Sequence, residues 1–378
     1  MGWDELLRML ADRPRENGTA ALYDTATFLR EVLSHAGIES RTFEYVAYPH
    51  RLGVIGVVAL LQAIAYAVAL RRHWSTVALA LAVLVPGMVI VELDWCIPVL
   101  GWMGGSAPAQ HVIAEIGPAQ PKSLLLVTAH YDTKTDLLDH VERAPIAILA
   151  LPVALLALGG ALWARRRPGG KLARWVGRIV VVQGIGGFVV LCGGVVASGR
   201  SHGALDNGGS CAVLVQLAKR LAAAPLAHTA VRFVWLSGEE EGVQGSWRYA
   251  EQALAARSLP IRVINLEGMG AASRFAVFGA EQSTFRRYPP DPFLLARADE
   301  AHRARTQLPI HVTWYSGVTD ARSFLAHEIP ALTVMGDTPD HSFTRHLHSA
   351  RDNRSRIAEA ALDDTVTFLL EVLRRLDA

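Results

Sequence analysis

The sequence predicts an α/β fold: a three-layer sandwich with a mostly parallel central sheet flanked by helices, plus two inserted transmembrane helical hairpins. Two observations lead to this prediction. Residues 199–378 alternate short β-rich runs with helical patterns, which is typical of a largely parallel sheet covered by helices. Four long uncharged runs interrupt the earlier part of the chain, and 51% of its 378 residues are hydrophobic. The formal net charge of +2 gives no reason to expect a nucleic-acid partner.

The N-terminal residues 1–50 are polar in character. Residues 25–35 have helical spacing and Gly37 is a plausible stop, after which residues 39–45 alternate like a strand. The first ten residues carry acids and lack a basic start before an apolar stretch, so we expect no cleavable signal peptide.

Four apolar runs suggest membrane spans. The first covers residues 53–70 and ends at Arg71, Arg72 and His73, and the second begins near Thr76 and continues to Val91. Two more cover 145–163 and 179–197, and each is close to the ~20 residues needed to cross a bilayer. Buried core helices of a soluble protein are the alternative, but cores rarely supply four such runs flanked by arginines.

The charge pattern predicts the orientation of these spans. The loop 164–178 is rich in basic residues, namely Arg165, Arg166, Arg167, Lys171, Arg174 and Arg178. Basic loops stay in the cytoplasm, so residues 1–50, 104–142 and 199–378 should form one extracytoplasmic domain. The hairpins 53–103 and 145–198 would be insertions in that domain and would contact the lipid bilayer. We therefore expect a multi-pass membrane protein with about four spans.

Elements of the α/β part follow one another in order. Residues 111–117 and 123–132 read as strands, as do 229–236, 261–266, 274–278 and 331–335. Helical patterns cover 207–221, 243–256, 291–305 and 355–376.

Acidic and imidazole side chains gather where the predicted strands end. They are His130 with Asp132 in an H-x-D pattern, Asp206 before Asn207, the pair Glu239–Glu240, then Glu267, and His348. Each alone is better explained as structural, for example Asp206 as a helix N-cap. Together they supply two imidazoles and several carboxylates, a donor set suited to two Zn²⁺ ions bridged by a carboxylate and a water.

The order of these motifs is similar to that of a known family. HYD, ALDNGGS, EE-x-G-x-x-G-S, NLEGMG and HS-x-x-D resemble the zinc aminopeptidase family that also holds glutamate carboxypeptidases and glutaminyl cyclases. The closest resemblance is to its membrane-bound endoplasmic-reticulum metallopeptidase branch. It covers residues 104–142 and 199–357 well, and 13–45, with RPRENGT, more weakly.

The resemblance implies a role for each matching residue. Asp206 would bridge two zinc ions, His130 and Glu267 would complete one, and Glu240 with His348 would complete the other. Glu239 would be the general base that takes a proton from the bridging water, and Asp132 would orient His130.

Two departures from the family pattern matter. Most members have Asp where this chain has Glu267, although the longer acid also occurs in the endoplasmic-reticulum branch. The last histidine is ambiguous, because His341, His346 and His348 lie close together, and only His348 has the family's spacing to the final helix.

These observations predict a membrane-anchored zinc exopeptidase that cleaves peptides, most simply an aminopeptidase. A glutaminyl cyclase-like acyltransferase with a single zinc is one alternative. A receptor or scaffold with a catalytically dead peptidase domain is another, but it would be expected to have lost ligands or the base. Specificity should depend on loops near 275–292 and 316–323, whose shape the sequence does not reveal.

Overall fold

The computed structural model describes residues 1–254, 258–314, 317–337 and 345–378. The chain divides into two compact units. The α/β unit holds residues 1–47, 107–134 and 199–378, and the helical unit holds residues 48–106 and 135–198. Each unit is described by itself.

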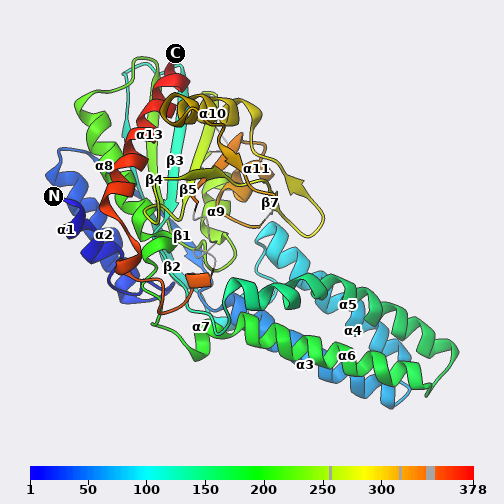
Figure 1. Cartoon of the computed structure of the whole chain (residues 1–378). Coiled ribbons are helices and arrows are strands. Elements are labelled where there is room, and N and C mark those ends of the chain that lie inside the picture. Colours follow the sequence, from blue (N-terminus) through cyan, green and yellow to red (C-terminus); the bar gives the residue numbers. More distant parts are fainter. Residues whose placement is uncertain (255–257, 315–316, 338–344) are drawn as a thin grey trace. The chain divides into compact units, whose positions relative to one another are not determined.

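An eight-stranded mixed sheet forms the centre of the α/β unit, in the order β1-β2-β4-β3-β5-β10-β6-β9 (Figure 1). The strands are β1 (Ser40–Ala47), β2 (Ala107–Ile116), β3 (Ser123–His130), β4 (Thr229–Leu236), β5 (Ile261–Glu267), β6 (Phe275–Val277), β9 (His311–Val312) and β10 (Ala331–Gly336). The four central strands β4, β3, β5 and β10 are parallel, whereas β2 and β6 pair antiparallel to them. The prediction of an α/β fold with a mostly parallel central sheet is confirmed.

Side chains of the central strands are buried on both faces of the sheet. Along β3, Leu125 and Val127 join one apolar cluster, whereas Leu124 and Leu126 join a second. This alternation follows from the two-residue period of a strand. Both faces are therefore covered by helices, which explains why β3 and β4 read as continuous apolar runs.

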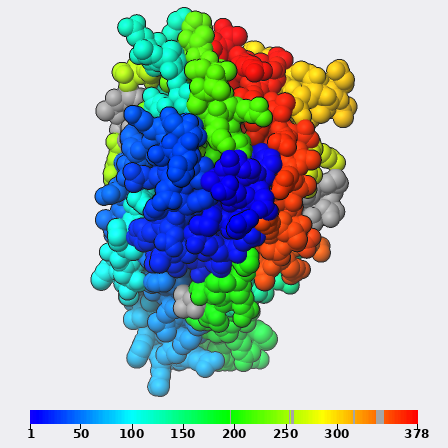
Figure 2. Space-filling view, turned by 90° about the vertical axis from the view of Figure 1, so that its left-hand side faces the viewer, coloured from blue at the N-terminus to red at the C-terminus, as the bar shows by residue number. Residues whose placement is uncertain are grey.

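The helices divide between the two faces. The first cluster includes residues of α1 (Trp3–Leu10), α2 (Ala20–His35), α8 (Gly209–Ala223), α10 (Pro292–Thr306) and α13 (Glu359–Asp377). The second includes residues of α9 (Gln244–Ala253) and α11 (Ala321–Ala326). In Figure 2 the N-terminal helices, in blue, cover part of the surface beside α8 in green and α13 in red.

Most of the predicted elements are present, with shifted ends. The helix predicted at 355–376 begins only at Glu359, because residues 354–356 form a separate turn capped by the Asn353 side chain. The end of the helix predicted at 243–256 lies outside the described residues. Helix α1 was missed by the sequence analysis: it has only 8 residues, and its Leu6, Leu7 and Leu10 are buried by tertiary contacts.

Four long helices make up most of the helical unit: α3 (Arg51–Arg71), α4 (Ser75–Trp95), α5 (His140–Arg166) and α6 (Lys171–Leu191). The prediction of an apolar helix at 179–197 was wrong in its position. Gly169, which has a positive φ, and Gly170 break the chain after α5, and α6 starts directly afterwards at Lys171.

The two helical hairpins lie in the same direction within this unit. Gly169, between α5 and α6, lies against the ring of His73, which follows α3. At the opposite end Cys192, after α6, donates a hydrogen bond to Gly53 O near the start of α3. The basic loops therefore share one end of the unit, and the ends joined to the rest of the chain share the other.

Charged side chains in the helical unit are paired at that second end. Arg51 and Glu92 are both buried and form an ion pair, with Nε 3.2 Å from Oε1. Glu92 also accepts hydrogen bonds from the main-chain N–H groups of Leu100 and Gly101. By length and composition alone, each of the four helices could cross a membrane.

Candidate metal centre

The predicted ligands converge at the carboxyl edge of three neighbouring parallel strands. His130 is the last residue of β3 and Glu267 the last residue of β5, while Glu239 and Glu240 follow β4 closely. Strand β3 lies between β4 and β5, so these side chains meet at one edge of the sheet. This is the edge at which open α/β sheets bind ligands.

Asp206 comes from a tight turn, Ala204–Gly208, that leads into α8. The Asp206–Asn207 peptide bond is cis. The buried Asp352 carboxylate accepts hydrogen bonds from the N–H groups of Leu205 at 2.7 Å and Asp206 at 3.1 Å. Asn207 Nδ2 donates to Glu267 Oε2 at 2.8 Å. The turn is thereby held from both sides, with the Asp206 carboxylate directed at the histidines.

The Asp206 carboxylate lies between two imidazoles. Its Oδ1 is 3.1 Å from His130 Nε2, and its Oδ2 is 3.1 Å from His348 Nε2. Glu267 Oε2 is 3.4 Å from His130 Nε2, and Glu240 Oε2 is 2.9 Å from His348 Nε2. The side chains thus form two groups of three, which share Asp206.

These separations fit two zinc ions. Donor atoms about 2.0–2.2 Å from a tetrahedral zinc lie roughly 3.3–3.6 Å apart. In each group the donor atoms lie within 4.8 Å of one another, and the imidazole–carboxylate distances are close to the tetrahedral value. Glu240 Oε1 is also buried without a hydrogen-bond partner in the described part of the chain, as expected for an atom that faces a cation.

Comparison with known proteins then identifies the family. The sequence profile described as peptidase family M28 matches residues 185–373. The chain belongs to peptidase family M28. A search of curated proteins gave no match.

Several solved structures share the fold. A Zn-dependent exopeptidase from Parabacteroides distasonis has 13% identity and a TM-score of 0.57, covering 98% of this chain and 94% of that one. The LapA aminopeptidase of Legionella pneumophila has 14% identity and a TM-score of 0.55, and the match covers 99% of this chain and 70% of that one. A Porphyromonas gingivalis glutaminyl cyclase has 14% identity and a TM-score of 0.55, and the match covers 98% of this chain and 94% of that one. At such low identity the likeness shows a common fold and does not select one reaction.

The M28 match begins after His130, so the place of this histidine in the site is known from the distances in the structure and not from the profile match. Its Nδ1 lies 3.1 Å from the main-chain oxygen of Asp132 and 3.7 Å from the carboxylate Oδ1. The carbonyl is therefore the atom that receives the Nδ1 hydrogen and leaves Nε2 free as a ligand. We expected the Asp132 carboxylate in this role.

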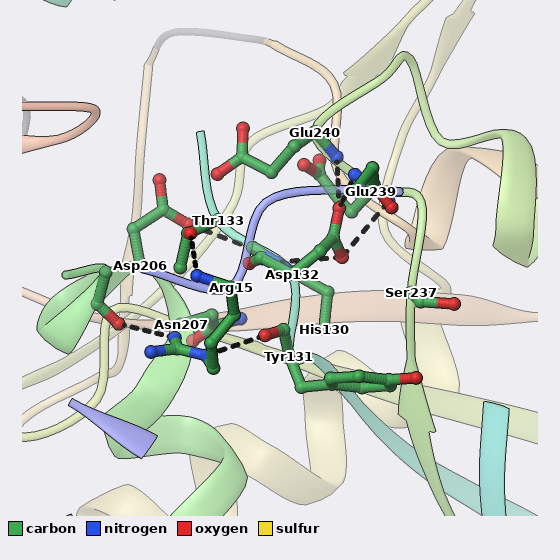
Figure 3. A network of polar contacts seen from close by, with 12 residues as sticks. Arg15, His130, Tyr131, Asp132, Thr133, Asp206, Asn207, Ser237, Glu239 and Glu240 are labelled. Carbon is green, nitrogen blue, oxygen red and sulfur yellow. Dashed lines mark hydrogen bonds and ion pairs between the residues drawn. The ribbon is translucent and has the colours of Figure 1, made fainter. Parts of the chain in front are cut away.

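The Asp132 carboxylate instead holds the Glu239–Glu240 loop of this M28 peptidase. It accepts hydrogen bonds from Glu240 N at 3.1 Å and from Glu239 N at 3.4 Å (Figure 3). It also accepts one from Asn17 Nδ2 at 2.7 Å. Asp132 thus joins the ends of β3 and β4, which carry His130 and the glutamate pair.

The electrostatics of the centre favour added positive charge. Burial raises the pKa of Glu240 and of Glu267, because the ionised forms lose hydration. Burial acts against ionisation of Asp206 too, but His130 and His348 outweigh it and hold its pKa well below its usual range. For His130 the lowering effect of burial is outweighed by the nearby carboxylates, led by Glu267, so its pKa is raised. Buried acids outnumber buried bases here, and bound divalent cations would reduce the resulting repulsion among the carboxylates.

Glu239 is half-buried and belongs to neither of the two ligand groups that share Asp206, although it lies beside His130 and Glu240. Its pKa is raised well above its usual range, chiefly by burial, with Glu240 and Asp320 adding repulsion. A carboxyl group with a raised pKa beside a metal centre is suited to accepting and returning a proton.

Some of the remaining predictions concern residues that the structure describes, and others concern residues outside its described ranges. Of the three histidines considered, His348 contacts the cluster, with a left-handed backbone (φ 55°), and His341 lies outside the described residues. Ser316, in a predicted specificity loop, lies outside them too. Arg15 and Asn17 were not predicted as site residues, although they lie in the RPRENGT segment that resembles the family weakly.

Proposed function

We propose that this protein is a membrane-anchored exopeptidase that uses two zinc ions, most simply an aminopeptidase. The observation that carries the proposal is the placement of Asp206, whose two oxygens each lie 3.1 Å from a different imidazole. One carboxylate shared in this way suits a bridging ligand. His130 and Glu267 would complete one zinc position, and Glu240 and His348 the other.

The two zinc ions, when bound, would lower the pKa of a water molecule and polarise the carbonyl of the scissile bond. Side chains of the protein would carry out the proton transfers. Glu239 would accept the proton of the attacking water and pass it to the nitrogen of the leaving amine. Asp132 would position Glu239 through its hydrogen bond to the main chain, and burial raises the pKa of Glu239, which favours its holding the proton between the two transfers.

Features of the helical unit support the proposal of a membrane anchor. Each long helix exposes large apolar side chains, for example Leu61, Leu84, Ile148 and Val182, which are 61%, 62%, 72% and 68% exposed. Such exposure is costly in water and expected against lipid. Helices of 21 residues are about 31 Å long, close to the hydrocarbon thickness of a bilayer.

Tryptophans lie at both ends of these helices, as in membrane-interface belts. Trp163 and Trp175 lie at the basic end, where Arg167 and Arg178 stack on their rings at 4.9 Å. Exposed Trp95 lies at the other end. With the basic end in the cytoplasm, the metal centre would be extracytoplasmic. Glu267 in place of Asp adds support for a relationship to the endoplasmic-reticulum branch.

The proposal is tested with the purified full-length protein in detergent. We expect two zinc ions per chain by elemental analysis, release of amino acids from unblocked aminoacyl and dipeptidyl substrates, loss of activity with a chelator, and recovery with zinc. Amino-terminally blocked peptides with a free carboxyl end test for a carboxypeptidase, and amino-terminal glutaminyl peptides test for a cyclase. Cyclisation with one bound zinc would overturn the proposal in favour of the cyclase, and a zinc-loaded protein inactive on all three classes would favour a scaffold.

A further inference from the structure

Arg15 is a fully buried arginine in the α/β unit whose guanidinium group donates four hydrogen bonds, all to main-chain oxygens. Its Nε donates to Tyr131 O at 2.8 Å. Nη1 donates to Arg13 O at 3.0 Å and His202 O at 2.7 Å, and Nη2 donates to Gly203 O at 3.0 Å. Burying a cation is costly, so a side chain bound in this way usually has a specific role.

Three of the four acceptors belong to the two segments that carry the proposed metal ligands, and Arg13 O lies in the segment of Arg15 itself. Tyr131 is the residue between His130 and Asp132, and His202 and Gly203 lead directly into the turn that presents Asp206. One rigid guanidinium therefore spans the end of β3 and the approach to α8 (Figure 3). Its planar group of donors fixes both distance and orientation, which a lysine cannot do.

The segment around Arg15 strengthens this connection. Arg15 N donates to Thr133 Oγ1 at 2.8 Å, and Thr133 N donates back to Arg15 O at 3.1 Å. Two residues later, Asn17 binds the Asp132 carboxylate at 2.7 Å. Gly203 has a positive φ, and a Cβ there would lie 2.2 Å from Thr133 Cγ2, so the two segments are packed too closely for any side chain.

Arg15 also supplies a fixed positive charge. Burial lowers the pKa of Arg15, and Asp352, Asp132 and Asp206 are among the groups that oppose this shift and favour the charged form. Arginine does not lose its proton in proteins, so this charge offsets part of the repulsion among the carboxylates whether or not metal is bound.

We propose that Arg15 is a positioning residue of the metal centre, which sets the spacing between His130 and Asp206. The proposal rests on the proposed zinc-binding function. Asp206 is shared by both zinc positions, but His130 belongs only to the position completed by Glu267, so the His130–Asp206 spacing matters at that position alone. Loss of Arg15 should therefore weaken zinc binding at that position far more than at the position of Glu240 and His348.

The test titrates zinc alone into chelator-stripped, full-length protein in detergent, with no peptide present. In Arg15→Met, we expect the dissociation constant of one zinc ion to rise by about 10–100-fold, the usual effect of losing a group that orients a metal ligand. The second ion should bind within about threefold of wild type. The matched control is Arg13→Met in the same segment, which removes a side chain paired with Asp24 at 3.8 Å and should leave both affinities unchanged.

A purely structural role makes a different prediction. It would lower the melting temperature of the metal-free protein but leave both zinc affinities, and the rise in melting temperature on adding zinc, as in wild type. That result, or an equal loss at both positions, would overturn the proposal. If Arg15→Met does not fold, the test uses Arg15→Lys, because lysine keeps the positive charge but lacks the planar group of donors. The Arg15→Lys variant should show a smaller loss of zinc affinity at the same position. Unchanged zinc affinities in this variant would overturn the proposal equally.

The experiment separates this inference from the proposed activity. A wild-type protein that binds two zinc ions but cleaves no peptide would reject the exopeptidase assignment and still report on Arg15. A wild-type protein that binds a single ion would reject the dizinc assignment, and an effect of Arg15→Met on that ion would then decide whether Arg15 positions it.

Discussion

His111 provides a prediction whose size can be worked out from the structure. The side chain projects from β2 and is fully buried. Its Nδ1 accepts a hydrogen bond from Ser237 N at 3.2 Å, so the ring hydrogen is on Nε2, which lies 3.1 Å from Gly245 O. Ser237 begins the loop that carries Glu239 and Glu240, so the neutral ring of His111 helps to hold the proposed base and a proposed ligand in place.

Burial lowers the pKa of His111 to about 4, from an ordinary value of 6.5, although the Gly245 carbonyl partly opposes the shift. The unfolded chain therefore takes up this proton at a higher pH than the folded chain. The stability contributed by the neutral ring is complete above pH 6.5 and is lost as the pH falls toward 4. A difference of about 2.5 pH units corresponds to roughly 3 kcal/mol.

The matched variant is His111→Asn, whose amide oxygen can accept the Ser237 hydrogen bond but cannot be protonated at pH 4. Hydrogen exchange followed by mass spectrometry on the metal-free protein would report the opening free energy of peptides from β4 and the loop after it. Between pH 7 and pH 4, wild type should lose roughly 3 kcal/mol more than the variant. Equal losses would show that His111 does not titrate in this range and would refute the reasoning.

Three further predictions concern the centre and the membrane orientation. Glu239→Gln should lower kcat on aminoacyl substrates by about 10²–10⁴-fold while two zinc ions stay bound, with Glu241→Gln as control; a smaller loss, or lost zinc, would reject Glu239 as the base. Asp206→Ala should reduce zinc content below two ions per chain by elemental analysis, because both imidazoles lose their shared carboxylate; full occupancy would contradict a bridging role. A reporter fused after Arg167 should behave as cytoplasmic, and a signal from the opposite side would invert the orientation.

Much of the fold was predictable because its signals are local. The apolar run at residues 229–236 matches β4 exactly in its ends, since burial on both faces leaves few polar side chains in the strand. The position of α6 was predicted less well. Hydropathy marks the apolar part of a helix, but its start at Lys171 depends on the glycines before it, and polar residues of its first turns are hidden from a hydropathy search.

Within the centre, the kinds of residue were predictable and some of the contacts were not. A carboxylate two residues after His130 predicts an orienting group, and the structure shows the main-chain oxygen of Asp132 in that place. The carboxylate turns toward Asn17, more than a hundred positions earlier in the chain. The sequence pattern does not encode that choice, because it depends on where another segment packs.

The sequence by itself determined the α/β class, the four apolar helices and the residue types of a metal centre, because periodicity, hydropathy and motif spacing are properties of neighbouring residues. Only the tertiary structure decided that Asp206 lies between His130 and His348, and that Arg15 joins the segments on which two of these residues stand. These contacts join residues far apart in the chain, and their distances are set by the packing of the sheet and its helices as a whole.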